Sequence, residues 1–147
     1  MYTITEIEDA IIATLKASEM GAYCKKIDSY QIEGGDLEEQ IRLFAGQLPC
    51  VLVMYTPDGA DCDYSFSGVE DEPMVFSILA CAQNLRGKGT ARRGVYDMLE
   101  DLRAALVGKN CGLDMDPLLR SSPKIEINTK NFSAYSMDFK TRRRNAL

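Results

Sequence analysis

The sequence contains no histidine among its 147 residues. Imidazole is the commonest general base in enzymes, and both the usual serine and cysteine triads and most catalytic zinc sites depend on it. Those classes of active site are therefore excluded. Carboxylates, lysine or tyrosine could still support catalysis, but the sequence favours a protein that is not an enzyme.

Long apolar runs and paired cysteines are also missing. No apolar run approaches the length of a membrane span, and Met1 is followed at once by a helix start rather than by a signal peptide. We therefore expect a soluble protein that is cytoplasmic where it is made. No CxxC motif occurs, and an odd number of widely spaced cysteines indicates buried free thiols rather than a zinc site. The five are Cys24, Cys50, Cys62, Cys81 and Cys111.

Positive charge is scarce in the first part of the chain. Residues 1–80 contain four lysines and arginines against fifteen acidic residues, whereas residues 81–147 contain thirteen against seven. The net charge is −5. Folding could interleave the two halves into a neutral surface. Alternatively, acidic and basic faces could persist and favour head-to-tail packing between copies of the chain.

Helix signals occur at three places. Thr3 and Glu6 form a capping box before a helix that we expect to reach about Glu19. Asp36 and Glu39 repeat that pattern before a short helix that Pro49 closes. The third helix carries an apolar stripe at helical spacing and ends near Gly108. Its stripe consists of Val95, Leu99, Leu102 and Leu106.

Six segments have strand patterns. The continuous apolar runs at 50–55 and 74–82 predict strands inside a sheet, and 63–69 is expected to form a hairpin with the strand before it. The other strands are expected at 23–31, 124–128 and 132–141. This order predicts an α+β fold, with a mixed, mostly antiparallel sheet and helices packed on one face. Residues 1–141 would form a single domain, followed by a basic C-terminal tail at 142–147.

A basic loop precedes the third helix, at the positive end of its dipole, where helix stability would favour acidic residues. A phosphate site there is conceivable, but the loop has neither GxGxxG nor GxxxxGK[ST] spacing. We expect no cofactor, and the basic residues indicate an acidic partner instead. They are Arg86, Lys88, Arg92 and Arg93.

Three other features have modest interpretations. The acidic turn between 58 and 72 lacks EF-hand spacing, so we expect no metal there. The seven tyrosines are expected to be packing residues with a wet hydroxyl. The basic tail could contact DNA phosphates or dock on a protein, and the second is favoured because no aromatic residue is interleaved with it.

Several segments resemble one family. ITEIEDAIIATLK, LPCVLVMY, NLRGKGTARRGVYDMLEDLRAALVG and FSAYSMDFKT occur in the order typical of small proteins encoded in the tail modules of Mu-like phages and prophages. Members of that family are regarded as tail terminator or tail completion proteins of contractile-tailed phages. The resemblance implies an α+β domain in a hexameric ring that caps the tube, stops polymerisation of tube and sheath, and joins the head–neck connector.

The resemblance also implies partners and a location. The partners would be other copies of the chain, tail tube and sheath proteins, and neck proteins, with DNA passing through the lumen and no membrane. The protein would reside in the virion tail or neck, and in the host cytoplasm during assembly. The alternatives are a neck or head-completion protein, a nucleotide- or nucleic-acid-binding module using Arg86–Arg93, and a small carboxylate-based enzyme.

We expect the contact residues of such a ring to be charged. The basic loop would face an acidic hairpin of the next subunit, which comprises Asp61, Asp63, Glu70 and Asp71. The tail would form an arm, disordered in the free protein, that orders on an acidic surface of a neighbour. Its basic residues are Arg142, Arg143 and Arg144.

Overall fold

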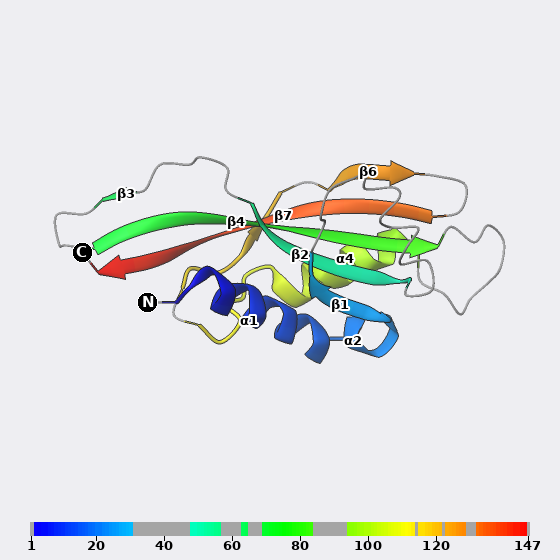
Figure 1. Ribbon diagram of the computed structural model, residues 1–147, viewed down its shortest axis with the longest axis horizontal. Coiled ribbons are helices and arrows are strands. Elements are labelled where there is room, and N and C mark those ends of the chain that lie inside the picture. The colour runs from blue at the N-terminus through cyan, green and yellow to red at the C-terminus, as the bar shows by residue number, and fades with distance from the viewer. Residues whose placement is uncertain are drawn as a thin grey trace.

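The computed structural model describes residues 2–30, 48–56, 63–64, 69–83, 94–113, 115–121, 123–128 and 132–146 (Figure 1). Its helices are α1 (Ile4–Ala17), α2 (Met20–Tyr23) and α4 (Val95–Leu106). Its strands are β1 (Lys26–Ser29), β2 (Cys50–Thr56), β3 (Asp63–Tyr64), β4 (Val69–Gln83), β5 (Leu119–Arg120), β6 (Lys124–Asn128) and β7 (Phe132–Ala146).

The strands form one mixed sheet in the order β1-β2-β4-β7-β5, with β3 paired to β4 and β6 paired to β7. Only the β1–β2 pair is parallel among the pairings that the structure describes. β4 and β7 are 15 residues each and pair along their whole length, from Val69 opposite Ala146 to Gln83 opposite Phe132. The predicted α+β class, with β2 and β4 inside the sheet, is confirmed.

The described helices cover one face of this sheet (Figure 1). The capping box of α1 is present, since the Glu6 amide donates to Thr3 Oγ1 and the Thr3 amide donates to Glu6 Oε2. Tyr23 donates a hydrogen bond of 2.6 Å to Asp101, which ties α2 to α4. Gly108, which follows the C-cap residue Val107 of α4, has a φ of +76°.

The main core lies between the helices and the sheet. Side chains alternate across a strand, so β4 and β7 each present every second residue to the helices. These include Phe76, Ile78, Met137 and Phe139 from the sheet, which pack with Ile7, Ile11 and Leu15 of α1 and with Met98, Leu102 and Leu106 of α4. A smaller cluster uses the opposite face: Leu48, Cys50, Leu52, Leu79, Cys81 and Ala134, with Tyr30 against them.

Several boundaries differ from the expected ones. The first helix ends at Ala17, where Ser18 Oγ donates to the Leu15 carbonyl and competes with helix continuation, and α2 follows. The first strand is limited to Lys26–Ser29. The helix expected between Asp36 and Leu48 falls mainly on 31–47, outside the described residues.

The prediction that 63–69 forms a hairpin with the preceding strand is wrong. β3 pairs with β4, with Asp63 opposite Asp71. The reason lies in the register of the sheet: β2 ends at Thr56 opposite Val75, so β4 extends beyond β2 and pairs there with β3. The described helices include none long and apolar enough to cross a membrane.

The last strand is longer than the sequence pattern indicates. We expected it to end at Thr141, with a disordered arm after it, but β7 continues through Ala146 alongside β4. Polar contacts hold its outer edge near this point, because Thr141 Oγ1 donates to the Asp116 carbonyl at 2.6 Å and the Asp116 amide donates to the Arg142 carbonyl at 3.2 Å.

Candidate assembly surface

The structure describes about half of the residues predicted to form contacts. Arg86, Lys88, Arg92, Arg93 and Asp61 lie outside the described residues, as does Asp58 of the acidic turn. The backbone is described for the remaining six. They are Asp63 in β3, Glu70 and Asp71 in β4, and Arg142, Arg143 and Arg144 in β7.

These six residues meet at one end of the sheet, which we call the β4–β7 arm. It consists of residues 69–73 of β4 and 142–146 of β7, with β3 alongside β4. In Figure 1 this end carries the C-terminus and projects past the start of α1. The register sets Asp71 opposite Arg144 and Glu72 opposite Arg143.

The arm therefore interleaves charges from the two halves of the chain. Opposite charges at directly paired positions of a sheet stabilise it by about 0.2–1 kcal/mol a pair. At this end, backbone segments of the acidic first half and the basic second half of the chain are paired with each other. A surface of mixed charge confers specificity on a contact more than net attraction.

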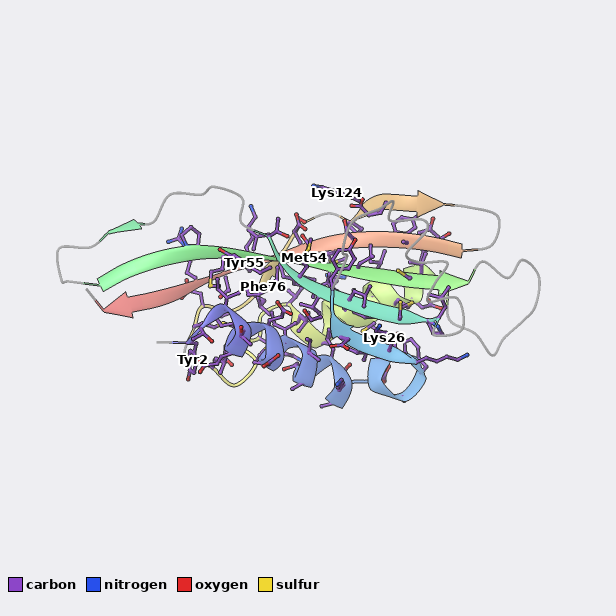
Figure 2. All side chains as sticks on the ribbon, viewed as in Figure 1. Tyr2, Lys26, Met54, Tyr55, Phe76 and Lys124 are labelled. Carbon is purple, nitrogen blue, oxygen red and sulfur yellow. The ribbon has the colours of Figure 1, made fainter. Side chains whose placement is uncertain are left out.

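A second feature is a hollow of about 300 Å³ on the face of the sheet opposite the main core. Lys124 extends on this side of the molecule, away from α1 (Figure 2). Met54 is 37% exposed there. The lining residues are Tyr30, Leu52, Met54, Thr56, Ser77, Leu79, Lys124, Glu126, Ser136 and Asp138.

Hydrogen bonds cross the floor of this hollow. Ser77 Oγ lies 2.8 Å from Thr56 Oγ1 and donates to Asp138 Oδ1 at 2.6 Å. The Asp138 amide donates to Ser121 Oγ at 3.2 Å, and Ser136 Oγ donates to Glu126 Oε1 at 2.7 Å. Burial, with smaller effects of Cys81 and Glu126, raises the pKa of Tyr30 and keeps its phenol neutral.

The hollow combines hydroxyl and carboxyl groups with apolar side chains. Ser77 is bonded to a carboxylate, which is a weak base, rather than to an imidazole that could activate it as a nucleophile. Within the described ranges there is no group of three or more cysteine, aspartate or glutamate residues placed to hold a metal ion.

Sequence reasoning missed three exposed apolar residues. Tyr96 is 69% exposed, Leu119 is 64% exposed, and Met54 lines the hollow. Tyr96, which we expected to be a packing residue with a wet hydroxyl, lies outside the apolar stripe of α4 and contacts Tyr135 edge-on, at 5.7 Å between ring centres. Exposed tyrosines are frequent anchors in protein interfaces. Its position in the sequence, directly after Val95 at the helix start, already indicated that Tyr96 faces away from the apolar stripe.

The fold and these surfaces define a class: an α+β domain with helices on one face of a mixed sheet, a charged arm at one end and a hollow on the other face.

Comparison with known sequences assigns the family. The chain belongs to the family described as "Bacteriophage Mu, Gp37", which matches residues 3–143. The resemblance to proteins of Mu-like phages is thereby confirmed over nearly the whole chain.

The fold recurs in a solved particle. A chain of the "Virion of native gene transfer agent (GTA) particle" superposes with a TM-score of 0.63 at 16% sequence identity, covering 99% of this chain and 100% of that one. At this identity the likeness concerns the fold. No curated protein matches the sequence.

Proposed function

We propose that this structural phage virion protein is the terminator of a contractile tail. It would cap the tail tube and sheath as a ring and form the joint to the head–neck connector, without catalysing a reaction. Membership of the Mu Gp37 family over residues 3–143 is the observation that carries the proposal. The fold shared with a chain of a gene transfer agent virion supports it.

The geometry of β4 is suited to a ring. The arm lies at the start of this strand, and Gln83, at the other end, leads toward the basic loop. The fourteen steps between the fifteen strand residues, at about 3.3 Å each, separate the two ends by about 45 Å. Two surfaces at opposite ends of a subunit can join head to tail, and such contacts form a ring when the rotation from one subunit to the next closes.

In this proposal the ring contact is made between the basic loop of one subunit and the β4–β7 arm of the next. The loop contributes Arg86, Lys88, Arg92 and Arg93, with Tyr96 beside it as an apolar anchor. The arm contributes Asp63, Glu70 and Asp71, together with Asp61. Arg142, Arg143 and Arg144 sit on the same arm and would set the register of the contact, or meet the tube or sheath.

The location of the protein in the particle tests this role. A tag placed before Tyr2 should be seen at the head-proximal end of the tail by immunogold microscopy. Tails purified from a mutant that makes no heads should retain the tagged protein, because a terminator belongs to the tail. Label on isolated heads alone would instead identify a neck or head-completion protein, and label along the tube would contradict both roles.

A further inference from the structure

Two cysteines face each other in the sheet. Cys50 of β2 is directly opposite Cys81 of the antiparallel strand β4. Residues so paired have Cα atoms about 4.5–5.5 Å apart, and disulfides span Cα distances of about 4.4–6.8 Å. Both side chains lie in the smaller buried cluster, and their thiols are hydrogen-bonded to each other. Both are free cysteines in this structure.

The other described cysteines are placed differently. Cys24 and Cys111 are half-buried and pack against the main core, on the helix side. Cys24, the C-cap residue of α2, is near Cys50 but packs against the main core, whereas Cys50 belongs to the smaller cluster. Cys50 and Cys81 share one face and one pair position, whereas Cys62 lies outside the described residues.

We propose that Cys50 and Cys81 are a redox site, which a small disulfide such as oxidised glutathione converts into a cross-strand disulfide between β2 and β4. The thiolate of one of the two cysteines attacks one sulfur of the small disulfide, releasing one small thiol and leaving a mixed disulfide. The other cysteine then attacks the protein sulfur of that mixed disulfide and releases the second small thiol. Two protein thiols and one small disulfide thus give one protein disulfide and two small thiols.

Each thiol affects the ionisation of the other. The hydrogen bond from Cys81 lowers the pKa of Cys50, and burial opposes that effect. The same hydrogen bond and burial raise the pKa of Cys81. The thiolate is the attacking species in disulfide exchange.

The cross-link would stabilise the fold. It closes the loop from Cys50 to Cys81 and so restricts the unfolded chain, which for typical disulfides shifts the folding equilibrium by roughly thirty-fold to a thousand-fold. A reducing cytoplasm keeps such thiols free, whereas a particle released from the cell meets oxidising conditions. Since both side chains are fully buried, oxidation in the native state requires local opening of this end of the sheet.

The test uses the full chain, refolded from denaturant in buffers of reduced and oxidised glutathione. Free thiols are alkylated in denaturant and counted by intact mass, and the linkage is mapped on peptides. We expect two of the five thiols to be lost, a peptide joining Cys50 to Cys81, and a denaturation midpoint that rises and returns after treatment with dithiothreitol.

Matched variants locate the bond. Cys81→Ala should abolish the linked peptide and the rise in midpoint, whereas Cys111→Ala should retain both. Five free thiols after refolding, or a bond joining Cys50 to Cys24 or Cys62, would overturn the proposal. The peptide map of the unsubstituted chain decides the question even where a variant folds poorly.

Discussion

Leu102 of α4 is fully buried against the sheet, whereas Leu119 of the short strand β5 leaves 64% of its surface exposed. Because the two residues have the same side chain, comparing the stability of their alanine variants isolates the effect of burial. Leu102→Ala removes apolar contacts and leaves a cavity, and we expect a loss of about 2–5 kcal/mol in the free energy of unfolding. Leu99→Ala should have an effect in the same range. Denaturant titration measures both.

Leu119→Ala is the matched control for that experiment. Because this side chain is exposed, its truncation should change the free energy of unfolding by less than about 0.5 kcal/mol. Equal midpoints for the Leu102 and Leu119 variants would mean that α4 does not pack on the sheet.

Cys24 gives the protein a dependence on alkaline pH. Burial, assisted by the charges of Cys50 and Asp101, raises the pKa of this thiol from 9.0 to about 12. Between those values the unfolded chain releases the proton while the folded chain retains it, so stability falls as pH rises from 9 to 12 and is unaffected below 9. Thermal midpoints between pH 8 and 11 should decline less steeply in Cys24→Ala. Parallel curves for the two proteins would refute the assignment.

At the scale of elements, the spacing of apolar residues predicted the helix and the strands that bury an apolar face. The stripe of Val95, Leu99, Leu102 and Leu106 identified α4 with its bounds, and the apolar runs identified β2 and β4 as internal strands. In each case one or both faces of the element are buried, and the spacing of apolar residues in the sequence follows from that burial.

The arm was not predicted because its pairing leaves no apolar pattern. Arg142, Arg143 and Arg144 read as a solvated tail on their own, and they become strand residues only because β4 continues beside them. The assignment of β3 to β4 depends on where β2 ends, which is a property of the register. Likewise, the hollow arises from side chains of β2, β4, β6 and β7 that no local motif connects.

Paired charges in the arm can be exchanged. Glu72 is opposite Arg143, so Glu72→Arg and Arg143→Glu should each destabilise the protein by up to about 1 kcal/mol, since each places like charges side by side. The double variant restores opposite charges and should recover most of that loss in a double-mutant cycle. Losses that simply add would show that the two residues do not interact within one chain.

Removal of the end of β7 tests the strand directly. Deleting residues 142–147 leaves residues 69–73 of β4 without their partners in β7, while β3 still pairs with Glu70 and Asp71. We expect faster amide hydrogen exchange there, with protection in α4 and in the middle of β4 unchanged. Deletion of Leu147 alone serves as the control. Unchanged exchange at 69–73 would mean that the tail does not pair with β4.

At the scale of the molecule, the sheet places the charged arm at one end and Gln83, the last residue of β4, about 45 Å away at the other. This arrangement is the physical basis for proposing a closed head-to-tail ring. The family assignment gives the biological setting of a phage protein, and the proposed role follows from the two together.

The tail-length distribution tests the central claim most directly. Particles are imaged by negative stain from a phage that lacks the gene for this chain, with and without a plasmid that supplies the protein. A terminator predicts tails of uncontrolled length that fail to join heads, and restoration of uniform, joined tails by the plasmid. Tails of normal length joined to heads in the absence of the protein would contradict the account.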